Sequence, residues 1–377
     1  MDILPDLPGG RPLKGRGAVS NASGRFEREV RVRVDDGWTP PADLPPTADD
    51  IPDPLAEDAA RPRTRILVDA TRTALTYNTS PDIPFDRSIN PYRGCEHGCV
   101  YCFARPSHAY LGLSAGLDFE TRILAKPDAA RLLRREISRR AYRCKPIAMG
   151  TNTDPYQPVE RKLRITRAII DVLSACDHPL SIVTKSDAIL ADRDVLADMA
   201  ARKLVKIYLS VTTLDPDLAR RLEPRATTPA KRLAAVRALN EAGIPTGVMV
   251  APVIPALTDH EIEAILAAAA NAGAREAGYI LLRLPLEVKD LFAEWLDAHE
   301  PDRAAHVLGL VRNMRKGTLN SAVFGTRMRG EGAYARLIQR RFELAARREG
   351  LNEENLAGLD CARFRPPLGT QEQLALF

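Results

Sequence analysis

The sequence predicts an α/β fold, a partial (β/α)6 barrel of the TIM type, and two observations carry this expectation. From about residue 85 onward, short apolar runs rich in β-branched residues alternate with stretches of helical periodicity. Strands that alternate with helices of this length imply a parallel sheet. Polar residues gather directly after the apolar runs, where a barrel of this kind has its active site.

Six βα units follow when the chain is taken in order. The first strand is expected just before Cys95, and Pro127, Pro229 and Thr258 are typical helix starts. Glycines follow two of the helices, as is usual at helix ends. The further strands are expected at 145–151, 180–186, 205–213, 246–255 and 279–285, and the helices at 127–142, 159–176, 187–202, 228–242 and 258–272.

The two ends of the chain differ from this core, which is expected at 61–300. Residues 1–60 are rich in Pro, Gly, Asp and Arg and are expected to be extended and poorly ordered, although 24–34 alternates like an edge strand. Residues 301–377 are expected to form a helical extension. One of its helices has a shared apolar face with arginines opposite, formed by Tyr334, Leu337, Ile338, Phe342 and Ala345.

The composition excludes several classes of protein. Hydrophobic residues make up 45% of the 377 residues and charged residues 27%, which is normal for a globular protein with a sizeable core. No apolar run approaches the roughly 20 residues that span a bilayer, and the start of the chain lacks the apolar region of a secretory signal. We therefore expect a cytoplasmic protein with no membrane partner. In that compartment clustered cysteines indicate metal binding or catalysis rather than disulfides.

The net charge of +5 is mild, but basic residues are unevenly distributed. Residues 131–145 carry seven basic residues and one acid, and residues 312–348 carry ten basic residues and two acids. Clusters of this kind can follow a phosphate backbone, so a nucleic acid is a candidate partner. A solvated helix face rich in arginine is the alternative.

The segment "GCEHGCVYCFAR" at 94–105 carries Cys95, Cys99 and Cys102 in the spacing C-x3-C-x2-C. Thiolates select iron–sulfur clusters or zinc. Three cysteines hold three irons of a [4Fe–4S] cube, and the fourth iron stays open for another ligand. An open metal position is typical of a chemical rather than a structural site. Gly94 and Gly98 allow the backbone to turn tightly around such a cube.

Zinc is the main alternative, with His97 as a fourth ligand. His97 is only two residues from Cys95 and from Cys99, whereas closed zinc sites usually pair ligands from two separated segments. A chance cluster of structural cysteines is a further alternative. Cys144, Cys176 and Cys361 are scattered and are expected to be ordinary core or surface residues.

With an aromatic residue before its third cysteine, this motif resembles the signature of radical S-adenosylmethionine (SAM) enzymes. The resemblance covers about residues 85–290, and "INPYRGCEHGCVYCFARPSHAY" followed by "GTNTDPYQPVE" resembles the branch related to spore photoproduct lyase. It implies a partial barrel, a [4Fe–4S] cluster and SAM as cofactors. It also implies an electron donor such as flavodoxin or ferredoxin, and a 5′-deoxyadenosyl radical that removes hydrogen from a substrate.

The resemblance also implies roles for particular residues. Tyr101 and Phe103 are expected against the adenosine part of SAM. The segment after the second strand is expected near the amino group or ribose of SAM, with Asp154 as a candidate partner of the ammonium. Lys185 resembles the lysine that pairs with the SAM carboxylate, and Ser210 resembles a ribose-binding serine. The residues in the segment after the second strand are Thr151, Asn152, Thr153 and Asp154.

The sequence departs from the lyase at one position. The lyase returns a hydrogen atom through a cysteine near the second strand end, where this chain has Thr151, and Cys144 lies before the strand. Tyr156 is therefore our candidate hydrogen donor, and it also suits packing beneath the SAM loop. Arg283 is a candidate for a substrate phosphate or for a loop carbonyl.

Two hypotheses follow for the whole chain. The first is a radical SAM enzyme acting on an unknown substrate, with a nucleic acid base as a candidate. The second is a non-catalytic iron–sulfur protein that senses redox state or carries electrons. The polar residues after the strands favour the enzyme, because an electron carrier needs only the cluster and usually a fourth cysteine.

Overall fold

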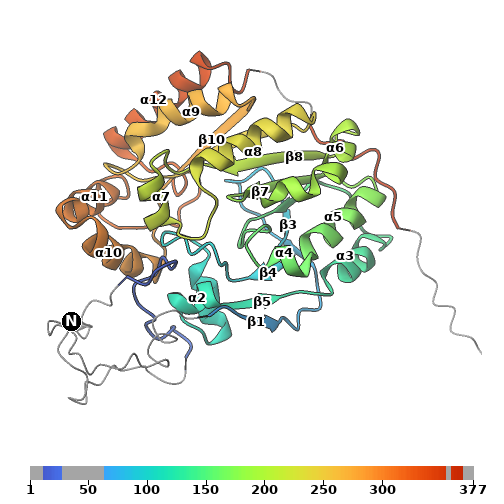
Figure 1. The fold of residues 1–377 in the computed structure, drawn as a ribbon, viewed down its shortest axis with the longest axis horizontal. Helices are drawn as coiled ribbons and strands as arrows, with labels where there is room; N and C mark the ends of the chain where they lie inside the picture. The colour runs from blue at the N-terminus through green and yellow to red at the C-terminus, as the bar shows by residue number, and fades with distance from the viewer. Residues whose placement is uncertain (1–11, 28–62, 354–357, 368–377) are drawn as a thin grey trace, which may run out of the picture.

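The computed structural model describes residues 12–27, 63–353 and 358–367 (Figure 1). Its main layer is a seven-stranded sheet in the order β10-β9-β8-β7-β6-β3-β2. All neighbours from β3 to β10 pair in parallel and in chain order, and β2 is antiparallel to β3. The six βα units and the partial barrel predicted from the sequence are thereby confirmed. The strands are β2 (Leu75–Tyr77), β3 (Arg87–Ile89), β6 (Ile147–Met149), β7 (Leu180–Thr184), β8 (Val205–Ser210), β9 (Thr246–Val253) and β10 (Glu276–Leu281).

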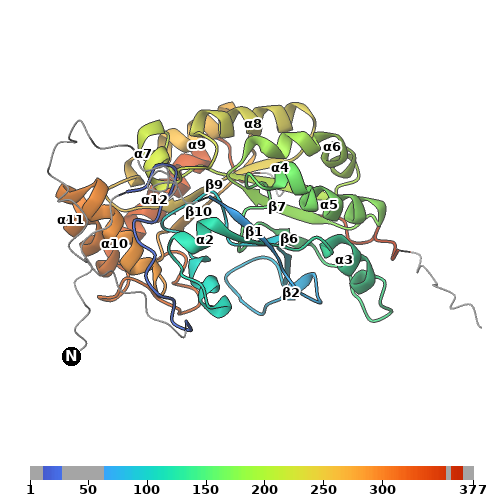
Figure 2. The same cartoon turned by 60° about the horizontal axis from the view of Figure 1, so that its bottom comes forward.

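Helices connect these strands, and Figure 2 shows α5, α6, α8 and α9 covering one face of the sheet. Their apolar sides and the inward side chains of the strands form one core, in which Ile147, Ile182 and Ile207 are fully buried. Helix α8 begins at Pro229, as predicted, and Gly243 follows its end with a positive φ of 74°. The elements are α3 (Ala129–Ile137), α4 (Glu160–Leu163), α5 (Ile165–Ala175), η2 (Asp187–Asp192), α6 (Arg193–Ala201), α7 (Pro216–Leu222), α8 (Pro229–Glu241), η3 (Asp259–Glu261) and α9 (Ile262–Asn271).

A second, small sheet was not predicted. Its order is β1-β5-β4, with β1 parallel and β4 antiparallel to the central β5. Strand β4 leads into the three-cysteine segment, and β5 follows it two short helical elements later, so this sheet supports both ends of the segment. The elements are β1 (Arg65–Val68), β4 (Tyr92–Arg93), η1 (Arg105–Leu111), α2 (Leu117–Thr121) and β5 (Arg122–Ala125).

Residues 12–27 contain no helix or strand and lie against the three-cysteine segment. The backbone N–H groups of Gly17 and Ala18 donate to the carboxylate of Glu120 at 3.0 and 2.8 Å, and Ala18 is buried. The strand predicted over 24–34 lies mostly outside the described residues, as does the predicted boundary near residue 60.

The C-terminal region is helical, as predicted, with α10 (Val288–His299), α11 (Pro301–Asn313) and α12 (Gly332–Arg348). Helix α12 packs on α9, but the prediction for its apolar face is wrong at Leu337, which is 52% exposed. The buried side of α12 is narrow and consists of Ala335, Ile338, Phe342, Ala345 and Ala346, and Leu337 lies outside it. No helix in the described ranges is long and apolar enough to cross a membrane.

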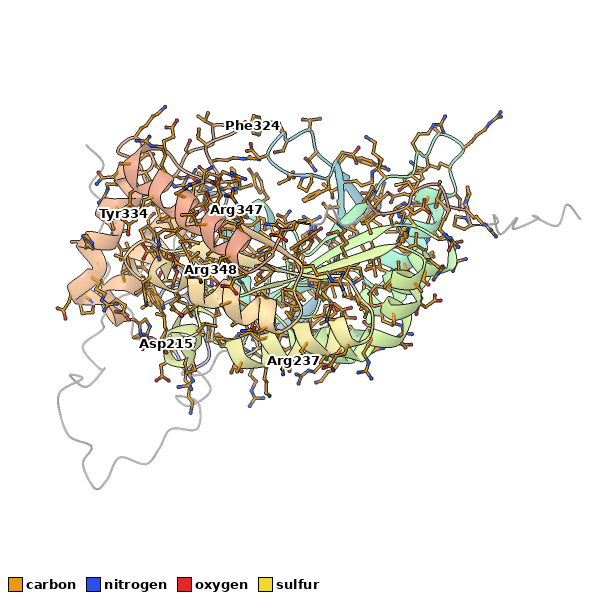
Figure 3. All side chains as sticks on the ribbon, turned by 90° about the horizontal axis from the view of Figure 1, so that it is seen from above. Asp215, Arg237, Phe324, Tyr334, Arg347 and Arg348 are labelled. Atoms are coloured by element: carbon orange, nitrogen blue, oxygen red, sulfur yellow. The ribbon has the colours of Figure 1, made fainter. Side chains whose placement is uncertain are left out.

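A segment that we call the strap, residues 315–331, joins the two edges of the open barrel. The Met328 carbonyl accepts from the Leu281 N–H of β10 at 2.9 Å. At the other edge, the Gly325 N–H donates at 2.6 Å to Asp82, which lies between β2 and β3 and also pairs with Arg327. Figure 3 shows Phe324 of the strap near that loop. The strap therefore spans the side that six strands leave open.

Candidate active site

The three-cysteine segment lies over the carboxyl ends of the parallel strands. The Thr153 hydroxyl, which follows β6, donates to the Gly94 carbonyl at 2.6 Å. Gln157 accepts from the Glu96 N–H at 2.9 Å and donates to the Gly94 carbonyl at 3.3 Å. These contacts hold the segment at the end of the barrel where the fold places a site.

The thiols of Cys95, Cys99 and Cys102 are free. Burial raises the pKa of the Cys95 thiol well above its usual value, and Asp154 and the other two thiols add to the effect. Burial, followed by Glu223, likewise raises the pKa of Cys99. The three sulfurs therefore interact electrostatically in a buried place, and a cation bound there would favour their thiolate forms.

Three thiolates in one segment are a donor set that iron–sulfur clusters use. Within the described ranges, no three His, Cys, Asp or Glu side chains are placed together as ligands of one metal ion. A [4Fe–4S] cube has no such requirement, because each thiolate binds a different iron. His97, the fourth ligand of the zinc alternative, has its Nδ1 3.3 Å from Asp154 Oδ2 instead.

A buried ion pair joins the last residue of the cysteine segment, Arg105, to Glu120 of α2. The fully buried Arg105 guanidinium donates to Glu120 Oε1 at 2.6 Å, and Glu120 is also fully buried. The same guanidinium donates to the carbonyls of Gly98 and Cys99 at 3.0 and 2.8 Å, and to Ala115 and Gly116. Arg105 thus fixes the backbone at the second cysteine, Cys99.

Gly98 lies directly against this pair. Its φ is +69°, which disfavours other residues, and a Cβ there would lie 2.8 Å from Glu120 Oε2. The glycine expected to permit a tight turn therefore also makes room for the carboxylate.

Asp154 is a centre of hydrogen bonds between two strand ends. It accepts from the Lys185 N–H and the Thr184 hydroxyl, each at 2.7 Å, and from the Tyr156 N–H at 2.8 Å. Burial acts to raise the pKa of Asp154, but the pairing with His97 and these bonds outweigh it, and the pKa is lowered. An ionised Asp154 therefore fixes His97 within the cysteine segment.

Glu223 forms a second centre of hydrogen bonds and ion pairs, which the sequence analysis missed. It is buried, pairs with the buried Arg232 and lies 3.3 Å from the Lys185 ammonium. It also accepts from the Thr212 hydroxyl at 2.6 Å and from the Tyr101 hydroxyl. Burial acts to raise the pKa of Glu223, but Arg232 and Lys185 outweigh it and lower the pKa.

The residues predicted to contact SAM differ in their partners and in their exposure. The Lys185 ammonium donates to the Ala251 carbonyl at 3.0 Å and lies 5.8 Å from the centre of the Tyr101 ring. Ser210 is buried, and its carbonyl accepts from Arg232 at 2.9 Å. Asn152 is exposed, and its N–H donates to Asn90 at 3.0 Å. Phe103 is 48% exposed.

Tyr156 is not directed at the cysteines. Its buried hydroxyl donates at 3.0 Å to Asp192, which also pairs with Arg164 and Arg167. The geometry does not support the hydrogen-donor role, which stays a prediction. Cys144 precedes β6, at the opposite end of that strand from the cysteine segment, so it does not replace the lyase cysteine.

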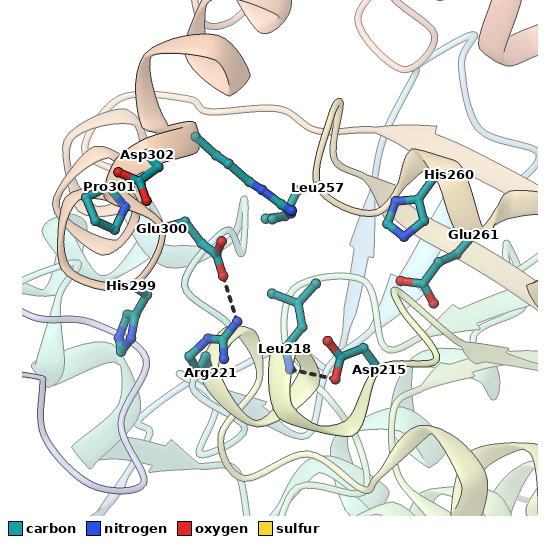
Figure 4. Close-up of a pocket in the computed structure, with 11 residues that line it drawn as sticks. Asp215, Leu218, Arg221, Leu257, His260, Glu261, His299, Glu300, Pro301 and Asp302 are labelled. Atoms are coloured by element: carbon teal, nitrogen blue, oxygen red, sulfur yellow. Dashed lines mark hydrogen bonds and ion pairs between the residues drawn. The ribbon is translucent and has the colours of Figure 1, made fainter.

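A groove of about 710 Å³ lies elsewhere, between α7, η3 and the start of α11 (Figure 4). Arg221 and Glu300 form an ion pair at 2.6 Å within it, and Leu218 and Leu257 contribute apolar surface. None of the three cysteines and none of the predicted SAM contacts lines this groove. Its size alone therefore does not make it the active site.

Comparisons with known proteins agree with this geometry. Residues 89–269 match the family model of the radical SAM superfamily. An uncharacterised protein of Mycobacterium tuberculosis, Rv2578c, is 39% identical over 232 residues, which cover 61% of this chain and 68% of that protein. An uncharacterised protein of Methanocaldococcus jannaschii, MJ0683, is 28% identical over 174 residues, 46% of this chain and 62% of that protein.

Solved structures show the same fold. Spore photoproduct lyase complexed with dinucleoside spore photoproduct has a TM-score of 0.56 at 18% identity, over 76% of this chain and 80% of that chain. A mutant of the lyase with bound AdoMet and the dinucleoside has a TM-score of 0.54 at 17% identity, over the same shares. At these identities the likeness concerns the fold.

Proposed function

The chain belongs to the radical SAM superfamily, and from that premise we propose that Cys95, Cys99 and Cys102 each bind one iron of its [4Fe–4S] cluster, leaving the fourth iron for SAM. A reduced cluster held by these cysteines would supply the one electron needed to cleave SAM to methionine and a 5′-deoxyadenosyl radical, and the radical would abstract hydrogen from the substrate. The observation that carries the proposal is the set of three free, electrostatically coupled thiols in one segment at the strand ends.

The residues around the thiols keep this segment rigid. Arg105 binds two carbonyls of the segment, those of Gly98 and Cys99, and Asp154 holds His97. Glu223 orients the Tyr101 ring through the tyrosine hydroxyl. A segment held in this way binds a cluster without having to order itself first, and buried walls exclude water from a reactive radical.

The residues proposed for SAM are Tyr101 and Phe103 for its adenosine, the 151–154 segment for its amino group or ribose, and Ser210 for its ribose. Lys185 is proposed for the carboxylate, although its ammonium already has Glu223 and Ala251 as partners. Direct binding by Lys185 would therefore require SAM to share or replace these contacts.

We propose a nucleic acid base as the substrate, reduced flavodoxin or ferredoxin as electron donor, and a modifying or lyase-like reaction. Support comes from the lyase structure of the same fold, in which the lyase is complexed with a dinucleoside. The basic stretches give separate support. Exposed arginines of 131–145 lie on and after α3, and those of 312–348 lie partly on α12, at the opposite side of the molecule in Figure 1. Two separated basic faces suit an extended polyanion better than a small anion.

The proposal is tested by anaerobic reconstitution with iron and sulfide. We expect about four irons per chain and a change in the electron paramagnetic resonance spectrum of the reduced cluster when SAM is added. The Cys102→Ala variant should lose this response, and Cys361→Ser, outside the segment, should keep it. A cluster whose spectrum does not change when SAM is added would favour the alternative of a redox sensor or electron carrier.

A further inference from the structure

Three arginines gather where the strap meets β10: Arg283, Arg315 and Arg327. Burial, and then the charge of Arg283, lower the pKa of Arg315 to about 10. Burial and then Arg327 lower the pKa of Arg283. Asp82 acts on the pKa of Arg283 in the opposite direction. Three cations therefore share a partly buried place with one acid.

Two of the three arginines have full sets of partners. Arg315 is buried and donates to the carbonyls of Leu281, Leu282 and Arg327, so it fixes the strap to the end of β10. Arg327 donates to Asp82 and to the Ser80 hydroxyl, so the carboxylate of Asp82 is already engaged. Both arginines have structural roles.

Arg283 has no comparable set. Its Nη1 lies 3.2 Å from Met328 Sδ, which is a weak acceptor. Its Nε is buried and has no hydrogen-bond partner among the described residues. Its guanidinium carbon lies 5.5 Å from the centre of the Phe103 ring, next in sequence to Cys102. A half-buried charge without an anion destabilises the folded chain, unless a ligand supplies the anion.

We propose that Arg283 is an anion-binding residue that takes a carboxylate or phosphate group at the carboxyl end of β10, beside Phe103. A guanidinium presents parallel N–H donors that match the two oxygens of either group, and the Phe103 ring supports the plane of the guanidinium. The site rests on the proposed function, since its ligand would lie next to the third cysteine.

Two sources fit this chemistry: the carboxylate of SAM and a phosphate of the substrate. The first follows from Lys185, whose ammonium is already paired with Glu223, so that a second cation is needed for the carboxylate. The second follows from the proposed nucleic acid substrate. The two are distinguished by which ligand depends on Arg283.

The experiment compares cluster-loaded wild type with Arg283→Gln and with Arg329→Gln, a matched loss of charge at an exposed position of the same strap. The melting temperature is measured anaerobically in chloride, in inorganic phosphate at equal ionic strength, and with SAM. We expect one of the two ligands to raise the melting temperature of the wild type and of Arg329→Gln. We expect the apparent affinity of Arg283→Gln for that same ligand to be at least tenfold lower than that of the wild type.

The same data separate an anion-binding role from a structural one. Without ligand, Arg283→Gln should melt no lower than the wild type, because the substitution removes an unpaired charge. If Arg283→Gln loses affinity for SAM, Arg283 binds the carboxylate of the cofactor. If it loses affinity for inorganic phosphate, Arg283 binds a phosphate of the substrate. A lower melting temperature without ligand, an unchanged response to both ligands, or no response in the wild type overturns the proposal. The phosphate response requires no SAM cleavage, so failure of the proposed chemistry is detected separately.

Discussion

Arg105 and Glu120 form an ion pair 2.6 Å long in which both side chains are completely buried, beneath the segment that carries the three cysteines. The carboxylate also accepts from two backbone N–H groups of residues 17 and 18, and the guanidinium donates to four carbonyls. One pair thus ties the N-terminal residues, the cysteine segment and α2 together.

Glu120→Gln should destabilise the chain and weaken cluster retention. It leaves the buried Arg105 without its counter-charge, and breaking a buried pair from one side costs about 3–5 kcal/mol. We expect a lower denaturant midpoint and less iron per chain after reconstitution. Asp128→Asn, which removes the exposed pair with Arg131, should change neither. Wild-type values for Glu120→Gln would contradict the role assigned to the pair.

Glu223→Gln should be more damaging than Lys185→Met. The first leaves the buried Arg232 and the partly buried Lys185 without a carboxylate, whereas the second leaves Glu223 paired with Arg232. Loss of a buried partner suggests about 3–5 kcal/mol for Glu223→Gln. The double variant should be less destabilised than the sum of the two, by about 1 kcal/mol or more. Additive effects in chemical unfolding would show that the Lys185–Glu223 contact contributes nothing.

Stability should fall as the pH falls from 7.5 to 5, partly because of His178. Burial lowers the pKa of His178 to about 4, and its ring nitrogens bond to Tyr142 and to the Pro179 carbonyl. The unfolded chain binds the proton near pH 6.5, so the stability from the neutral ring is complete above that pH and is lost as the pH falls towards 4.

Over this interval the wild type should therefore lose about 2 kcal/mol more than His178→Gln, which cannot titrate. Chemical unfolding at the two pH values measures the difference. The exposed His306 gives the control, since His306→Gln should retain the wild-type pH dependence. Equal losses in wild type and His178→Gln would show that the ring is not held neutral.

Cys144 and Cys361 should form a disulfide with an oxidant, because the two thiols are close enough that Cys361, after burial, raises the pKa of the Cys144 thiol. The Phe364 ring, 5.7 Å from Tyr142 and 5.1 Å from His178, holds the segment that carries Cys361 in place. Exchange with oxidised glutathione should release two reduced glutathione molecules and give one cross-linked peptide by mass spectrometry. Cys361→Ser should give no cross-link. Mixed disulfides alone in the wild type would contradict the geometry.

The barrel could be predicted from the sequence because its signal is local. Most of the strands stand out as short apolar runs and several helices begin or end at typical residues, so β3 and the five later parallel strands were expected in order. The predicted strand 279–285 begins three residues later than β10 does, because Glu276, Ala277 and Gly278 are not apolar enough to extend the run.

The supports of the site could not be predicted, because they depend on contacts between distant residues. Glu120 meets Gly17 and Ala18 across about a hundred residues, and Glu223 meets Tyr101 across 122. No periodicity or motif marks either carboxylate. The cysteines could be identified because their spacing is itself the signal. The partners of Arg105, Lys185 and Asp154 can be identified only in the folded chain.

The central claim is that one iron is left for SAM, and its most direct test is the reductive cleavage of SAM. Reconstituted protein is incubated anaerobically with dithionite and SAM, and 5′-deoxyadenosine is measured by mass spectrometry. The account predicts product from the wild type and from Cys361→Ser, and none from Cys99→Ala. Wild-type protein that carries zinc, or a complete [4Fe–4S] cluster that forms no 5′-deoxyadenosine, would contradict it.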